Sequence, residues 1–350
     1  MLIPLLPLPL LLLIASAIAA EWVPRPPLDL VKHLVSAALL VILFEGGLQI
    51  GVRRIRAVAG QVLALGVLGT VATVASAALA AHLLLDVSWF VAVLIGTAIA
   101  PTDPAVVFSV LGKKGSAGRA GTLLQGESGA NDPVGISLMA ALIAAGSLSG
   151  SAIADAAGAF ALQLALGAAL GVASGLLLRR LPLPGLLGAA ALFALTVLCQ
   201  GSGFLAVFVA GIVLADQDPP YARVHAVLAS AGEVVAFCLL GLTIDIGVLG
   251  RADVLLPALA LGGLLIAVLR PAVGFPLLLG SGLSLREQAF VLLGGLKGAV
   301  PLLLGSMLLD RPDIADGPRL YGVVVVVVVL SVLLQGSLVG PLARRWRLAD

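Results

Sequence analysis

Two aspartates lie in the middle of long apolar segments, Asp103 in residues 88–111 and Asp132 in residues 120–146. A carboxylate at membrane depth costs roughly 2.5–3.5 kcal/mol on insertion scales, so it is seldom retained without a function. Prolines stand beside both acids, at Pro101, Pro104 and Pro133. Proline frees backbone carbonyls that only a protein interior or a water-filled cavity can satisfy. Buried acids and broken helices together indicate a path for small cations.

The second aspartate belongs to a polar helical face. Ser128, Asn131 and Asp132 are spaced i, i+3 and i+4, so a helix brings them together. A hydroxyl, an amide and a carboxylate are the oxygen donors that hard cations prefer. Serine and asparagine also hold membrane helices together, so Ser128 alone fits either role, whereas Asp132 is predicted to be functional. Glu127 lies about 140° from Asp132 around the helix and is predicted to point elsewhere.

The first aspartate is predicted to lie at a helix interruption. Pro101 and Pro104 flank Thr102 and Asp103. A break here would expose carbonyls of the first half-helix and N–H groups of the second. Two roles are open for Asp103: it binds the ion, or it neutralises the positive N-terminal end of the second half-helix.

A basic residue stands deep within the apolar segment 286–309, at Lys297. It is too far from either end to reach water cheaply and requires an anionic partner, for which we predict Glu127. Gly298 and Pro301 predict a second interrupted helix. Two interrupted helices in corresponding halves of a chain are typical of transporters built from inverted repeats, although the halves here share no sequence identity.

Composition places these elements in a membrane. The chain is 61% hydrophobic and 11% charged, with a mean hydropathy of +1.18. Soluble domains are about 25% charged, which excludes that class. At about 20 apolar residues per span, we predict an all-α polytopic protein of about twelve membrane helices, forming one transporter domain over 1–350 with no soluble domain. The predicted spans are 2–20, 30–50, 57–81, 88–111, 120–147, 153–178, 184–199, 203–215, 226–247, 253–280, 286–309 and 319–343.

Charge placement predicts the orientation. Basic clusters recur in alternate loops, at Arg53–Arg56, Lys113–Arg119, Arg179–Arg180 and Arg344–Arg347. The positive-inside rule therefore predicts a multi-pass protein of the cell membrane with both termini in the cytoplasm. Two cysteines and three histidines, none at metal-ligand spacing, indicate neither a disulfide framework nor a bound metal cofactor. We expect no enzyme activity and no cofactor. The roles of Glu45, Glu233 and Asp245 stay open.

Five motifs resemble the monovalent cation:proton antiporter family, specifically its NhaP-like bacterial sodium/proton and potassium/proton exchangers. They follow one another in family order along nearly the whole chain. The motifs are Phe44–Leu48, Thr102–Pro104, Glu127–Pro133, Gly203–Gly211 and Gly295–Pro301.

This resemblance implies a site and an assembly. It makes Asp132 the shared carrier of cation and proton, with Thr102, Ser128 and Asp103 around the ion. Asn131 stands where electrogenic relatives carry a second acid, which implies electroneutral exchange. The resemblance also implies an ion pair between Glu127 and the late basic position, which is usually arginine and is Lys297 here.

The resemblance further implies a homodimer in lipid, with no nucleic-acid partner. Dimer-type helices are expected at 1–81 and 184–247, and core helices at 88–147 and 253–343. Family members usually have thirteen helices, and this chain is expected to start at the second.

Three transport functions fit the acids. The first is antiport of Na⁺, K⁺ or possibly Li⁺ against H⁺, and the motif at Glu127–Pro133 is closer to the potassium branch. The second is a cation channel, but channels tend to ring their pores symmetrically, whereas this cluster is asymmetric. The third is a sodium-coupled organic-anion symporter, in which Lys297 binds the substrate while Asp103 and Asp132 hold sodium.

Overall fold

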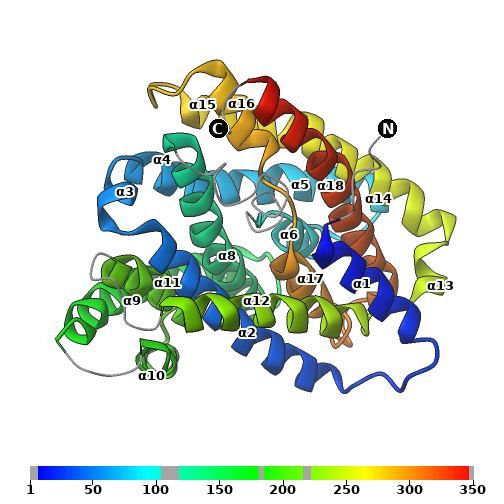
Figure 1. Cartoon of the computed structure of the whole chain (residues 1–350). Helices are drawn as coiled ribbons and strands as arrows, with labels where there is room; N and C mark the ends of the chain where they lie inside the picture. The colour runs from blue at the N-terminus through cyan, green and yellow to red at the C-terminus, as the bar shows by residue number, and fades with distance from the viewer. Residues whose placement is uncertain (1–6, 104–117, 181–184, 216–221, 347–350) are drawn as a thin grey trace.

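A computed structural model describes residues 7–103, 118–180, 185–215 and 222–346, and the regular elements in these ranges are all helices (Figure 1). The first half contains α1 (Leu8–Ala19), α2 (Leu28–Ile50), α3 (Val52–Arg56), α4 (Ala59–Leu63), α5 (Thr70–Leu85), α6 (Trp89–Ile99), α8 (Arg119–Ala145) and α9 (Gly150–Leu178). The second half contains α10 (Gly185–Leu198), α11 (Gly203–Leu214), α12 (Ala222–Gly241), α13 (Ile246–Leu249), α14 (Ala252–Leu264), α15 (Arg270–Leu278), α16 (Leu285–Leu293), α17 (Ala299–Ser306) and α18 (Gly317–Arg345).

Several helices are long and apolar enough to cross a membrane. Among the described residues five stretches meet this criterion: Ala59–Leu85, Gly150–Leu178, Arg223–Gly241, Ala252–Leu278 and Gly317–Ala343. Shorter apolar helices accompany them, at α1, α6, α10 and α11. The protein is therefore a multi-pass membrane protein, and the total of twelve spans stays a prediction.

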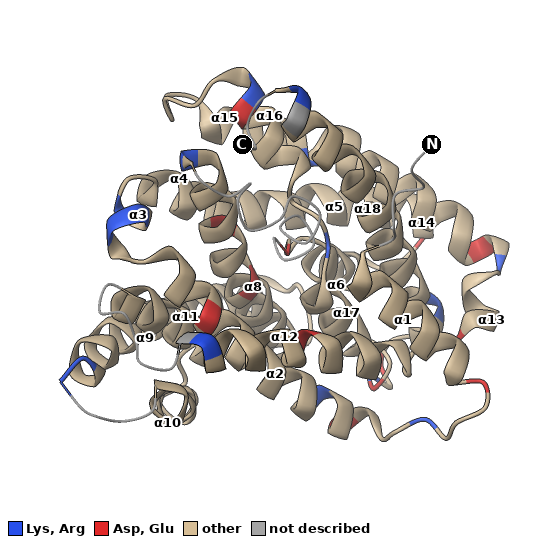
Figure 2. Cartoon of the chain, in the orientation of Figure 1, with Lys and Arg blue, Asp and Glu red and all other residues tan. Residues whose placement is uncertain are grey.

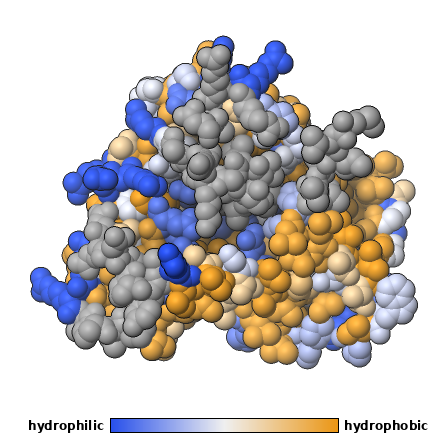
Figure 3. Space-filling view, viewed as in Figure 1, coloured by the Kyte–Doolittle hydropathy of each residue, from blue (hydrophilic) through white to orange (hydrophobic). Residues whose placement is uncertain are grey.

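Its surface matches a lipid environment. In α9 only 17% of the most apolar window is buried, so most of that helix presents hydrophobic side chains outward. Leu83 and Leu198 are 72% and 82% exposed, which water would penalise and lipid would not. Figure 3 shows broad hydrophobic areas on one face, and Figure 2 shows that charged residues gather mainly near helix ends.

Glycines allow two central helices to cross closely. A Cβ on Gly47 of α2 would lie 2.3 Å from the carbonyl oxygen of Phe208 in α11. A Cβ on Gly211 of α11 would likewise lie 2.4 Å from the carbonyl oxygen of Phe44 in α2. Only residues without side chains permit this approach, which is common between membrane helices. The crossing fixes α2 as one wall of the site described below.

Two helices stop near mid-segment, in agreement with the prolines and glycines of the sequence. Helix α6 ends at Ile99, and residues 100–103 are non-helical. Residues 294–298 are likewise non-helical between α16 and α17. Pro301 lies in the first turn of α17, where its missing N–H leaves no helical hydrogen bond unmade. The continuation of the first interrupted segment, from Pro104, lies outside the described residues.

Two long helices contain a π-helical turn. Ala64–Gly69 joins α4 to α5, and Leu265–Leu269 joins α14 to α15. π-helical turns are often found at functional sites. Here Gly66 of the first turn packs so closely on α8 that a Cβ would lie 2.8 Å from the Cβ of Ala130. The second turn immediately precedes Arg270, a buried residue of the site.

Candidate cation-binding site

The two non-helical stretches contact each other through the backbone. The N–H of Asp103 donates a 2.7 Å hydrogen bond to the carbonyl of Leu296. Asp103 also lies directly against Gly298, where a Cβ would be 2.1 Å from its Oδ2 atom. Gly298 precedes the first residue of α17, so the carboxylate of Asp103 stands at the positive end of that half-helix. One of the two roles that the sequence left open for Asp103 was to neutralise the second half of its own segment, which lies outside the described residues.

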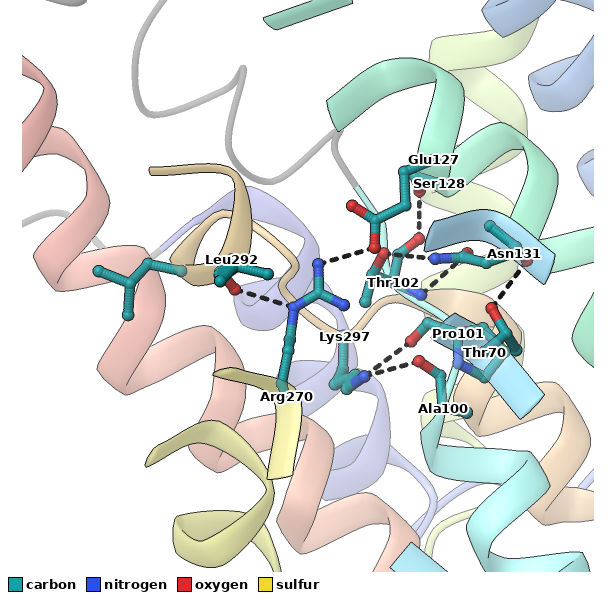
Figure 4. A network of polar contacts seen from close by, with 12 residues as sticks. Thr70, Ala100, Pro101, Thr102, Glu127, Ser128, Asn131, Arg270, Leu292 and Lys297 are labelled. Carbon is teal, nitrogen blue, oxygen red and sulfur yellow. Dashed lines mark hydrogen bonds and ion pairs between the residues drawn. The ribbon is translucent and has the colours of Figure 1, made fainter. Parts of the chain in front are cut away.

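Hydrogen bonds to backbone carbonyls hold the side chain of Lys297 next to the site. Its side chain is almost fully buried, and Nζ donates to the carbonyls of Ala100 and Pro101 at 2.9 and 3.1 Å (Figure 4). These carbonyls follow α6, where the helix dipole favours a cation. The backbone N–H of Lys297 donates to Ser331 of α18 at 3.1 Å. Lys297 thus stabilises the end of a half-helix.

Helix α8 holds the first break in place. The amide of Asn131 accepts from the N–H of Thr102 at 3.2 Å and donates to the Oγ1 atom of Thr102 at 2.7 Å. The Ser128 hydroxyl donates to the carbonyl of Thr102. All three residues are at most 1% exposed. The structure therefore brings the predicted polar face of α8 into contact with the predicted break.

A cavity of about 220 Å³ opens beside this network. Four carboxylates line it: Glu45 from α2, Asp103 from the first break, Asp132 from α8 and Glu233 from α12. The lining among described residues includes no lysine or arginine. Ser128 also reaches the cavity, whereas Thr102 and Asn131 are absent from its lining and lie behind it. The acids are spread over the walls, since no three metal-ligating side chains converge within the described part of the chain.

Asp132 is the least satisfied of the buried acids in this cavity. Asp132 is 8% exposed, and its Oδ1 atom has no hydrogen-bond partner among the described residues. A buried carboxylate oxygen without a donor is costly unless a cation or a proton compensates it. The geometry therefore fits a group that exchanges cation and proton.

The predicted ion pair between Glu127 and Lys297 is wrong. Arg270 of α15 donates to Glu127 instead, at 2.9 Å, with side chains only 9% and 2% exposed. Arg270 also donates from Nε to the carbonyl of Leu292 at 2.8 Å (Figure 4). Glu127 does point away from the acid cavity, as its helical angle indicated, and contributes to a separate small polar space with Asn131 and Arg270. The arginine inside the apolar segment 253–280 was a second basic candidate in the sequence, beside Lys297.

Glu45 and Glu233, left open by the sequence, prove to line the cavity with Asp132. Gln49 donates to Glu45 at 3.1 Å, one turn further along α2. Asp245 has a different place, at the start of α13, where it pairs with Arg25 at 3.7 Å. The site thus contains acids from two sides: α2 and α12 on one, and α8 with the first break on the other.

Two interrupted helices beside a buried acidic cavity define the class of fold, and comparison with solved structures agrees. The fold superimposes with a TM-score of 0.80 on the sodium proton antiporter MjNhaP1 from Methanocaldococcus jannaschii, at 21% identity, covering 98% of this chain and 92% of that one. A family model described as "Sodium/hydrogen exchanger, transmembrane" matches residues 2–345. The chain belongs to this family.

Curated relatives have related names. The chain is 32% identical over 328 residues to the K(+)/H(+) antiporter NhaP of Alkalimonas amylolytica, covering 88% of this chain and 56% of that protein. It is 30% identical over 337 residues to the K(+)/H(+) antiporter NhaP2 of Shewanella sp. (strain MR-4), covering 89% and 57%. The chain thus spans little more than half the length of these relatives.

Proposed function

We propose that this chain is a secondary antiporter that exchanges a monovalent cation, K⁺ or Na⁺, for H⁺, with Asp132 as the shared carrier. The single observation that carries this proposal is the cavity with four carboxylates and no basic residue in its described lining. Such a lining attracts cations and repels anions. It argues against the symporter for an organic anion, because Lys297, its expected anion site, is engaged by the carbonyls of Ala100 and Pro101.

Proton and cation compete in this mechanism for one buried carboxylate. Asp132 bears no charge-compensating partner when both are absent, so the empty state is the costly one to move across the membrane. The site can then move across the membrane only with a cation or a proton bound to Asp132, and exchange follows. Asn131 holds Thr102 and adds no second charge, which supports one proton per cation. The names of the relatives support K⁺ as the first cation to test.

The element order supports the predicted inverted repeat. Each half has a helix with a π-helical turn, then a helix that ends at a non-helical stretch, then a long helix. In the first half these are 59–85, α6 with residues 100–103, and α8. In the second half they are 252–278, α16 with residues 294–298, and α18. Alternating access would rock these elements against α2 and α12. Thr70–Leu85 packs mainly against α6, which favours grouping it with the moving body rather than with the dimer-type helices. A homodimer with both termini in the cytoplasm belongs to the same proposal.

The test is proton movement reported by a pH-sensitive dye in proteoliposomes on addition of K⁺, Na⁺ or Li⁺. We expect a signal with at least one cation and none in Asp132→Asn. The matched control is Asp155→Asn, which removes an exposed aspartate of α9 outside the cavity. Exchange that survives in Asp132→Asn would overturn the assignment of the carrier. Cation-independent proton flux, or flux that does not saturate with cation concentration, would favour a channel.

A further inference from the structure

Two carboxylates of the cavity, Glu45 and Glu233, have no role in the mechanism above, and of these Glu45 accepts a hydrogen bond from Gln49. Glu233 lies at mid-length of α12, and one face of that helix lines the cavity over three turns. The lining residues of this face are Ala226, Ala229, Ser230, Glu233 and Phe237. Their spacing of three or four residues places Glu233 between small residues on one side and Phe237 on the other.

The neighbours of Glu233 leave its carboxylate facing the cavity. Ala226, Ala229 and Ser230 are too short to cover it. Phe237, one turn beyond Glu233, also lines the cavity and is 1% exposed. A cation in the cavity therefore reaches the level of Glu233 without passing a bulky side chain of α12.

Glu233 is not part of a structural ion pair. None of the ion pairs between described residues includes it, in contrast to Glu127, which Arg270 neutralises. The side chain is half-buried rather than extended into bulk solvent. Across the cavity lie Asp132 of α8 and Asp103 of the first break, while Glu45 comes from α2 on Glu233's own side. All the charged groups of this lining are acidic, so each strengthens the demand for a cation.

We propose that Glu233 is an affinity-determining residue for the transported cation: it holds the entering ion opposite Asp132 and sets its apparent affinity without carrying the exchanged proton. This inference rests on the proposed function. Because Glu233 belongs to α12 and Asp132 to α8, an ion between them bridges the two sides of the cavity. A relative movement of these helices separates the two carboxylates and releases the ion to one of them.

The test is the cation dependence of exchange in proteoliposomes at fixed pH, read as separate KM and maximal rate. Glu233→Gln keeps the shape and removes the charge, and we expect its KM to rise about 3- to 30-fold, the range for one charge across a partly hydrated cavity. The maximal rate should stay within about twofold of wild type. Glu233→Asp should bring KM most of the way back.

Two further variants make the result specific to charge. Arg223→Gln removes an exposed charge of α12 outside the lining of the cavity and should leave KM unchanged. The double variant Ser230→Asp with Glu233→Gln moves the charge by one turn and should lower KM relative to Glu233→Gln alone. If Glu233→Gln is not recovered as a monodisperse protein, Glu233→Ala replaces it in both comparisons, because it also removes the charge.

The outcomes separate the two proposals. A wild-type protein without cation-driven proton movement would refute the proposed function itself. An active wild type in which Glu233→Gln has an unaltered KM, or loses maximal rate only, would overturn the role of Glu233 and leave the proposed function intact. The same holds if Ser230→Asp fails to lower KM in the Glu233→Gln background.

Discussion

Replacing Arg270 by methionine should strongly destabilise the protein, because it leaves Glu127 buried without its cation. The guanidinium is held from two sides, by Glu127 at 2.9 Å and by the carbonyl of Leu292 at 2.8 Å. The residue also fits a tight space, since a Cβ on Gly295 would lie 2.1 Å from its Nη2 atom. The Oε2 atom of Glu127 already lacks a partner among the described residues, so no second donor stands ready to replace the arginine.

The expected loss is about 3–5 kcal/mol in the free energy of unfolding, which is the cost of removing one partner from a buried ion pair. Replacing both partners by apolar residues of similar size avoids the orphaned charge and is often close to neutral. The double variant Glu127→Leu with Arg270→Met should therefore lose no more than about 2 kcal/mol, mostly through the unpaired carbonyl of Leu292. The coupling between the two sites should exceed about 1 kcal/mol.

The assay is unfolding in mixed micelles, titrated with a denaturing detergent and followed by the circular dichroism of the helices. Arg286→Met is the matched control, because Arg286 is exposed at the start of α16 and should leave the transition unchanged. If Arg270→Met unfolded at the wild-type midpoint, or if the double variant were as unstable as the single one, the buried pair would not stabilise this fold as argued.

Two further perturbations test the framework around the cavity. Lys297→Met removes the donor to the carbonyls of Ala100 and Pro101 and should lower the free energy of unfolding by about 1–3 kcal/mol in the same titration. Lys297→Arg keeps the positive charge and should lose less. Equal losses in the two variants would show that the charge does not contribute to stability. Gly298→Ala places a Cβ 2.1 Å from Oδ2 of Asp103 and should lower the exchange rate on the order of tenfold or more, because displacements near 1 Å are that costly at functional sites. Gly263→Ala, which meets no atom within 4 Å, is its control, and an unchanged rate in Gly298→Ala would contradict the close contact.

The sequence predicted the parts of the site that depend on one helix. The spacing of Ser128, Asn131 and Asp132 sufficed to place them together, because helical geometry alone sets which residues share a face. Prolines and glycines likewise located both interruptions. The mutual contact of these breaks, by the hydrogen bond from Asp103 to Leu296, needed the tertiary structure.

The partner of Glu127 could not be read from the sequence because two basic residues lie at membrane depth. Choosing between Arg270 and Lys297 requires the rotation of each helix about its axis. The π-helical turn Leu265–Leu269 alters that rotation immediately before Arg270, and apolar composition gives no signal for it. The inward direction of Glu45 and Glu233 was hidden for a similar reason, since each lies on a helix that is apolar on several faces.

The two buried basic residues explain why the cavity can hold a cation. Arg270 is paired with Glu127, and the ammonium of Lys297 donates to the carbonyls of Ala100 and Pro101 after α6. Neither basic residue is in the described lining of the cavity. The four carboxylates that remain repel one another across about 220 Å³. A cation or protons relieve this repulsion, and they do so as alternatives, because either adds the positive charge that the cavity lacks. In the proposed mechanism, exchange follows because these acids are shared between two walls of the cavity, and separating the walls changes how tightly the cation or proton is held.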